Sequence, residues 1–320
     1  MKQKRNGLLE IYRFLLCFLP LYYHNFFFWE RNYEVFGIPE LAVDFFFMLS
    51  GFFLIGSMRK LKEERLLCGT WKMMFGRLKP MLFTLCFIVV FNAICILLFV
   101  REDYFGTLFD LFKYWWFVLY LTIGIGVFYL IYRLLRKEGL FVAFLVLVAL
   151  GMATLQYFVL VKGMFFSDLV FPIRTFGCLA AGMIVSYIPG LKKGRIFLSI
   201  LAVAVLFPTL IYLMYSVKNF WICILIISMF GALMYFSANI TFGGKIFDLI
   251  GQLSVRMYLY MAFVTMLRIL GLSNYRILFV IDVTLASLDL CVCYYRDKYF
   301  ELKKQLPITD APKRLFKRKK

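Results

Sequence analysis

One histidine and one arginine on the first apolar stretch have the types and spacing that could carry proton transfer beside an anionic substrate. His24 is the only histidine among 320 residues, and Arg13 precedes it by eleven positions. On one continuous helix, eleven steps of about 100° return to nearly the same face, and the two side chains lie about 16 Å apart along the axis. An imidazole can act as a general base or a nucleophile, and a guanidinium binds phosphate or carboxylate. His24 also fits an anchor at a membrane interface, because aromatic residues flank it.

Two carboxylates accompany this pair. Glu10 lies one turn before Arg13 on the same face, so we expect it to hold the guanidinium in position. The alternative is that Glu10 helps to cap the helix, because an acid in the first turn interacts favourably with the helix dipole. Asp44 lies in the second apolar stretch and needs a partner if it is buried. We expect Asp44 to orient His24 or to line a cavity.

Four more charged residues fall inside later apolar stretches, where a charge is costly and therefore a candidate for function. We expect Arg174 to line a cavity, and Arg256 to extend its guanidinium to an interface. Asp282 and Asp289 lie seven positions apart, which places them on one helix face. We expect them to hold helices together, and pairing with the two arginines is the alternative.

The composition requires a membrane to surround these residues. The chain is 63% hydrophobic, with a mean hydropathy of +0.83, and its apolar residues extend almost from end to end. A water-soluble fold has too little interior to bury them. Eight cysteines are scattered without metal-ligand spacing, so we expect no metal site. The net charge of +19 comes from short segments between apolar runs, which indicates membrane topology and not nucleic-acid binding.

Runs long enough to span a bilayer take about 20 residues each, and the chain contains ten of them. We predict an all-α, polytopic transmembrane bundle of about ten spans. The spans are 8–28, 36–56, 80–100, 114–132, 139–160, 169–189, 196–216, 219–239, 250–271 and 276–295.

Strict alternation of these spans separates the basic residues between the two sides. With both termini cytoplasmic, the inner segments hold 27 Lys and Arg residues and the outer segments hold seven. Cytoplasmic loops carry the excess of basic residues, so this arrangement is favoured. Residues 1–295 then form one membrane domain, and 296–320 form a cytoplasmic polybasic tail that lies on anionic lipid headgroups.

The cytoplasmic basic loop 57–80 is the longest inner connection. Its seven basic residues alternate with Trp and Met side chains, which predicts a short amphipathic helix at the interface. Lys72, Arg77 and Lys79 belong to this loop and would attract an anion that approaches from the cytoplasm.

The order and spacing of several motifs resemble those of the membrane acyltransferase 3 family. RFLLCFLPLYYH (Arg13–His24) is similar to the Arg-x10-His pattern of its first span, and AVDFFFMLSGFFL (Ala42–Leu54) to its second-span signature. Met261 stands where many members have a second histidine, Lys79 replaces an arginine, and Ala42 replaces a glycine. The other matches, in chain order, are GRLKP (76–80), YWWFVLYL (114–121), RTFGCLAAGMI (174–184) and LIGQLSVRMYLYM (249–261).

The resemblance implies an enzyme that moves an acyl group, commonly acetyl, from a cytoplasmic coenzyme A thioester to a hydroxyl of a carbohydrate or lipid-linked glycan. It further implies a multi-pass protein of the cell membrane, and we expect a bacterial source. Arg77, Lys79, Lys72 and Arg13 would then meet acetyl-CoA, a polyanion. His24 would take the proton of the acceptor hydroxyl or be transiently acylated, and both routes stay open.

Trp115 and Trp116, with Arg174, are candidates to bind the acceptor, although lipid contact explains the tryptophans equally simply. Two other classes of function remain. A transporter or flippase could move a glycan or small molecule through the charged interior without chemistry, although the halves show no repeat. A non-catalytic assembly subunit is the third class. Replacing His24 separates them, since transport through Arg and Asp sites would survive it.

Overall fold

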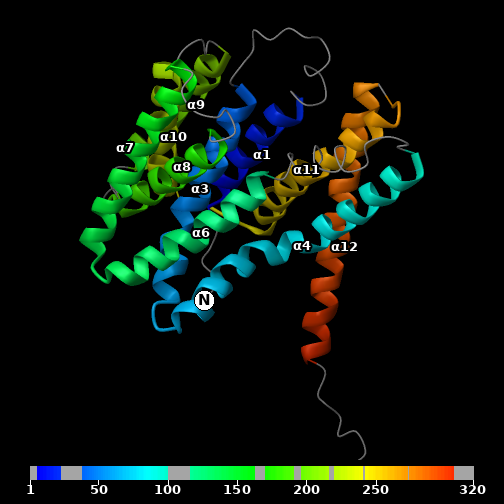
Figure 1. Cartoon of the computed structure of the whole chain (residues 1–320), viewed down its shortest axis with the longest axis horizontal. Helices are drawn as coiled ribbons and strands as arrows, with labels where there is room; N and C mark the ends of the chain where they lie inside the picture. The colour runs from blue at the N-terminus through cyan, green and yellow to red at the C-terminus, as the bar shows by residue number, and fades with distance from the viewer. Residues whose placement is uncertain are drawn as a thin grey trace, which may run out of the picture.

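The computed structural model of the chain consists of helices over the residues that it describes, which are 6–22, 38–99, 116–162, 170–190, 196–215, 220–240, 242–272 and 274–305. Figure 1 shows these helices gathered in one bundle. In chain order they are α1 (Gly7–Tyr22), α3 (Ile38–Lys60), α4 (Leu66–Phe99), α6 (Trp116–Leu135), α7 (Glu138–Lys162), α8 (Val170–Tyr187), α9 (Ile196–Tyr215), α10 (Phe220–Ala238), α11 (Lys245–Ile269) and α12 (Tyr275–Gln305).

Each described helix falls on one of the apolar runs expected from the sequence. Nine of these helices are long and apolar enough to cross a bilayer, and α1 has 16 described residues. Outer helices expose apolar side chains over most of their surface, as at Leu97 (73%), Leu147 (70%) and Phe197 (77%). Such surface is stable in hydrocarbon and not in water. The prediction of an all-α polytopic membrane bundle is confirmed.

The basic segment 57–80 differs from its predicted form. We expected a separate short amphipathic helix, but α4 begins at Leu66 and runs through Pro80 to Phe99 as one helix. Proline removes one backbone hydrogen bond, a loss that membrane helices tolerate when neighbouring helices support them. The connection between α3 and α4 is limited to the turn 61–65.

Ion pairs and backbone contacts bring the predicted cytoplasmic connections together. Arg133 near the end of α6 donates from Nη1 to the carbonyls of Leu61 (3.2 Å) and Glu64 (2.8 Å). Arg59 at the end of α3 makes two hydrogen bonds to Glu138 at the start of α7, at 3.1 and 2.9 Å. The α3–α4 and α6–α7 connections therefore lie side by side.

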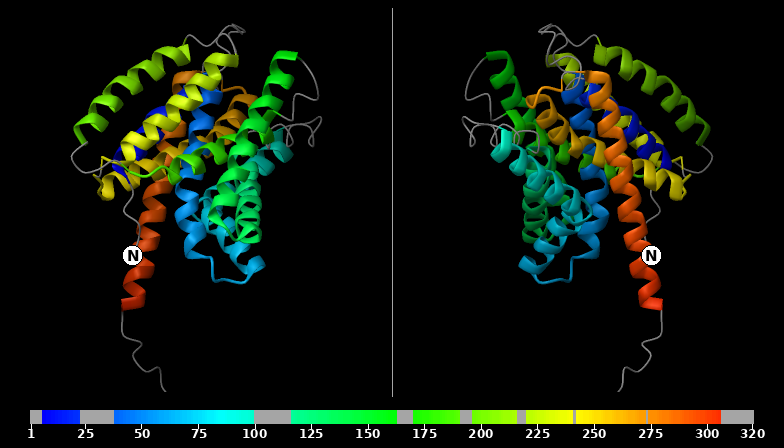
Figure 2. Two further views of the ribbon diagram at one scale, coloured as in Figure 1. Left: turned by 90° about the vertical axis from the view of Figure 1, so that its left-hand side faces the viewer. Right: turned by 90° about the vertical axis from the view of Figure 1, so that its right-hand side faces the viewer.

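Further contacts extend the same end of the bundle. The guanidinium of Arg59 lies 5.4 Å from the ring centroid of Tyr187, at the end of α8. The Tyr235 hydroxyl of α10 donates to the Pro189 carbonyl (3.0 Å), and the Asn6 amide donates to a carbonyl at the end of α10 (2.8 Å). Figure 2 shows the last turns of α12 leaving the bundle on this side. The shared end agrees with strict alternation, and its cytoplasmic location stays a prediction.

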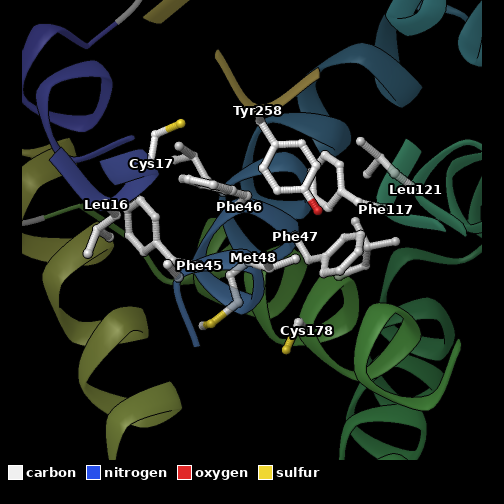
Figure 3. Close-up of a cluster of buried hydrophobic side chains, with 14 of the residues drawn as sticks. Leu16, Cys17, Phe45, Phe46, Phe47, Met48, Phe117, Leu121, Cys178 and Tyr258 are labelled. Carbon is white, nitrogen blue, oxygen red and sulfur yellow. The ribbon is translucent and has the colours of Figure 1, made fainter. Parts of the chain in front are cut away.

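Helix α3 forms the centre of the bundle. Residues 45–48, Phe-Phe-Phe-Met, are all buried although successive residues of a helix point in different directions. Neighbouring helices therefore surround α3, and α1, α6, α8 and α10 all pack against it. Figure 3 shows these four side chains pointing toward residues of several other helices.

The closest approach is between α3 and α8, through reciprocal glycines. A Cβ atom on Gly51 would overlap the carbonyl of Leu179, and one on Gly182 would overlap the carbonyl of Met48. Small residues let two membrane helices bring their backbones into contact. This contact fixes the rotation of α3 about its axis, and with it the side chains that α3 presents to the other helices.

Candidate active site

A cavity of about 180 Å³ lies where α1, α3, α4, α6 and α11 meet. Its charged lining residues are Arg13 from α1, Arg77 from α4 and Arg256 from α11. Among the described residues that line it there is no carboxylate. Ser50, Gln252, Ser254 and Tyr258 add polar groups to the lining. A chamber with three guanidinium groups inside a membrane protein is suited to bind an anion.

Arg13 is held by Glu10, as the spacing of three residues predicted. Its Nη1 donates to Oε2 of Glu10 at 2.9 Å, and Glu10 is only 2% exposed. Behind the carboxylate, Gly251 of α11 leaves no space for a side chain, because a Cβ atom there would overlap Glu10. The guanidinium of Arg13 is therefore positioned by a carboxylate that α11 confines.

The cavity reaches the surface beside Arg77 on α4. Gly76 and Pro80 line the cavity and are exposed, so the opening lies on this helix. The two lysines predicted to bind the donor with Arg77 are not among the described residues that line the cavity. Lys72 forms an ion pair with a glutamate at the surface, and Lys79 is exposed. Their role in attracting the donor stays a prediction.

Arg256 contradicts the expectation that its guanidinium reaches an interface. The residue is 5% exposed and lines the cavity. Its Nε lies 3.3 Å from Oδ2 of Asp289 on α12, and the Thr84 hydroxyl of α4 donates to the same carboxylate oxygen. A carboxylate inside the bundle keeps the guanidinium inside as well, because a buried charge is stable only beside a partner. The alternative that Asp289 pairs with an arginine is confirmed.

The rest of the cavity wall is apolar and aromatic. Phe46 of α3 and Phe117, Leu121 and Ile125 of α6 line it, with Tyr258 of α11. The rings of Phe117 and Tyr258 have their centroids 5.2 Å apart, and Figure 3 shows them side by side. This wall can hold the apolar part of a ligand whose anionic part contacts the arginines.

Asp44 has a partner that its sequence context did not indicate. Arg174 of α8 donates from Nε to Oδ1 (3.1 Å) and from Nη2 to Oδ2 (2.8 Å), and the two residues are 5% and 1% exposed respectively. This bidentate pair lies between α3 and α8, and neither residue is among the described residues that line the cavity. The prediction that Asp44 orients His24 stays a prediction, because His24 lies outside the described residues.

The predicted acceptor-binding tryptophans are only partly described. Trp115 lies outside the described residues. Trp116 is half-buried, with ring centroids 5.7 Å from Phe47 and 4.6 Å from Phe171. The indole packs between aromatic rings of α3 and α8 and does not line the cavity, which favours a packing role for this residue.

Family-like motif residues converge on the cavity from four helices after α1. In the second-span signature these are Phe46 and Ser50, and in GRLKP they are Gly76, Arg77 and Pro80. Phe117 and Leu121 come from YWWFVLYL (114–121), which resembles the family pattern Trp-Phe-x-x-x-Leu. Gly251, Ser254, Tyr258 and Leu259 come from LIGQLSVRMYLYM (249–261), which resembles the pattern Ile-Gly-x-x-Ser-x-x-x-Tyr-Leu. Arg256 falls on a position that this last motif leaves open, so the motif gave no signal for it.

The fold and the cavity define a polytopic helical membrane protein with an arginine-lined chamber inside the bundle. Residues 8–296 match the acyltransferase 3 family, described as an acyltransferase domain. The chain therefore belongs to this family and is a membrane acyltransferase. No curated protein and no solved structure matches it.

Proposed function

We propose that this acyltransferase takes its acyl group, most simply acetyl, from a cytoplasmic acyl-CoA and transfers it to a hydroxyl of a carbohydrate or lipid-linked glycan. The observation that carries the proposal is that Arg13, Arg77 and the motif residues of α3, α6 and α11 line the same cavity. We further propose that the protein works in the cell membrane of a bacterium.

The charge of the cavity suits this donor. Coenzyme A carries several phosphate charges, and a guanidinium binds phosphate through paired, charge-assisted hydrogen bonds. Arg77 lies next to the exposed Gly76 on α4, and Arg13 lines the same cavity from α1, so one bound donor could contact both guanidinium groups. The apolar part of the lining is suited to the thioester arm.

Acyl transfer to a hydroxyl needs a base and a leaving group. The acceptor oxygen attacks the thioester carbonyl, the carbon–sulfur bond breaks, and coenzyme A leaves as a thiolate that recovers the proton. His24 removes the hydroxyl proton in one route. In the other, the imidazole attacks first, forms an acyl-imidazole and releases coenzyme A, and the acceptor hydroxyl then takes the acyl group. Both routes use His24, which lies outside the described residues.

The test uses the full chain, purified into lipid nanodiscs and supplied with radiolabelled acetyl-CoA and a panel of glycans. We expect label in one glycan and none after His24→Ala. The matched control is Tyr212→Ala, which also removes a ring, at a position 72% exposed on α9. Full transfer by H24A would remove His24 from the mechanism, and no transfer by the wild type to any acceptor would count against the proposed donor and acceptor.

Donor binding is tested separately from transfer. The double variant Arg77→Ala with Lys79→Ala should weaken binding of tritiated coenzyme A, because it removes two positive charges near the opening. The control is Lys60→Ala with Lys62→Ala, which removes two exposed charges from the neighbouring connection. Equal coenzyme A affinity in both double variants would contradict the proposed entry path.

A further inference from the structure

Arg256 has donor capacity that the described part of the protein does not use. Its Nη1 donates to the Gln252 carbonyl at 3.3 Å, and its Nε makes an ion contact with Asp289 that is not a hydrogen bond. A guanidinium carries five N–H groups in a planar fork. Nη2 of Arg256 has no hydrogen-bond partner among the described residues, and the side chain lines the cavity.

The position of Arg256 is fixed from behind by residues of two other helices, α12 and α4. Asp289 of α12 accepts from the Thr84 hydroxyl of α4 through Oδ2 and from the Cys293 thiol through Oδ1 at 3.4 Å. Its Oδ2 also faces the Arg256 Nε. Because both oxygens of the Asp289 carboxylate have partners, the carboxylate is fixed, and it holds the Arg256 guanidinium in one position.

The three arginines of the cavity come from three different helices. Arg13 is backed by Glu10 and Arg256 by Asp289, and both carboxylates lie outside the described cavity lining. The chamber is therefore lined by the guanidinium groups of Arg13 and Arg256, whose counter-charges are outside the described lining, and by Arg77. In a low-dielectric interior this arrangement favours an anion with several oxygens, such as a phosphate or diphosphate group.

We propose that Arg256 binds a phosphate or diphosphate group together with Arg13 and Arg77, and that Asp289 and Thr84 are positioning residues for it. The inference rests on the proposed function and deepens it, because it assigns the anionic part of a substrate to the cavity. Two substrates could supply this group: the diphosphate of coenzyme A, or the diphosphate of a lipid-linked acceptor.

Direct binding to the nanodisc-embedded protein tests the assignment without requiring catalysis. The probes are tritiated coenzyme A and, separately, a radiolabelled polyprenyl diphosphate. Arg256→Gln should weaken the affinity for one of them by roughly 10- to 100-fold, the value of hydrogen bonds to a charged group. Arg256→Lys should lose part of this affinity, because an ammonium keeps the charge but not the fork. The probe that responds identifies the source of the phosphate.

Controls separate binding from folding. Arg268→Gln changes the same residue type on α11, outside the described cavity lining, and should leave both affinities within about twofold. Arg256→Met with Asp289→Leu removes both charges, so neither is left buried alone, and should fold but still lose the affinity. Thr84→Val should weaken binding and Thr84→Ser should restore it, which a purely structural role for Arg256 would not require.

Unchanged affinity of a folded Arg256→Gln protein for both probes would overturn the assignment while leaving the proposed function standing. A wild type that binds only polyprenyl diphosphate, with the affinity lost in Arg256→Gln, would support the assignment and reject the coenzyme A donor. A wild type that binds neither probe would overturn both.

Discussion

Gly251 of α11 lies directly against the carboxylate of Glu10 on α1, so that a single added carbon at Gly251 would overlap the acid. The same carboxylate accepts the hydrogen bond from Arg13 at 2.9 Å. A backbone position with no side chain therefore sets where the first arginine of the cavity lies. This relationship connects helix packing to the charge of the site.

Gly251→Ala should weaken donor binding because the new methyl group displaces Glu10 and with it the guanidinium of Arg13. We expect the affinity for coenzyme A to fall by roughly tenfold, the loss of about one charge-assisted hydrogen bond. Gly76→Ala is the matched control, since Gly76 also lines the cavity but a Cβ there would meet nothing within 4 Å. Equal loss in both variants would show that the effect is not transmitted through Glu10.

Local spacing and span length were predictable from the sequence. The length of each apolar run is set by bilayer thickness, so the described helices cover the expected runs, although α4 also includes much of the basic segment 57–80. The Glu10–Arg13 pair follows from helical periodicity alone, since residues three apart are neighbours on the surface of a helix. That Arg13 and Arg77 reach one cavity also agrees with their predicted joint role.

The contacts between distant helices were not predictable in the same way. Arg174 lies 130 positions after Asp44, and their pairing depends on the rotation of α3 against α8, which reciprocal glycines fix. Arg256 was expected at an interface because the sequence does not show which way a helix turns its charged side chain. The continuity of α4 through Pro80 depends on support from neighbouring helices, which one segment cannot reveal.

The buried pair of Asp44 and Arg174 predicts a test that separates structure from catalysis. Asp44→Asn or Arg174→Met alone should destabilise the protein by about 3–5 kcal/mol, because each leaves one buried charge without its partner. The double variant Asp44→Leu with Arg174→Met should recover most of this stability. Thermal unfolding in detergent, with a probe of helix content, measures the three variants.

Activity of the double variant then decides the role of Asp44. A folded Asp44→Leu, Arg174→Met protein that still transfers acyl groups would limit the pair to holding α3 against α8. A folded but inactive one would support the original prediction that Asp44 acts in the reaction. If the double variant were as unstable as the single ones, the pair would not be a simple charge-compensated contact.

The size of the apolar wall should set the length of the acyl group. Leu121 lines the cavity and is 6% exposed, so Leu121→Ala opens space in the apolar wall that is proposed to contact the thioester. We expect kcat/KM for butyryl-CoA to rise relative to acetyl-CoA by roughly tenfold, since one methylene in an apolar pocket is worth about 10- to 200-fold. Leu119→Ala, at a site 58% exposed on the same helix, should leave the ratio unchanged. A donor preference equal to the wild type in L121A would place the acyl group elsewhere.

Two aspartates seven positions apart on α12 should respond to mutation in opposite directions. Both carboxylate oxygens of Asp282 are buried without a hydrogen-bond partner among the described residues, whereas Asp289 contacts Thr84 and Arg256. An unsatisfied buried polar group costs about 1–3 kcal/mol, so Asp282→Leu should raise the free energy of unfolding by that amount. Asp289→Leu should lower it, because the Arg256 charge is then left buried alone. Thermal unfolding of the two variants in the same detergent measures the difference. If D282L were destabilised as much as D289L, Asp282 would have a stabilising partner in the folded protein.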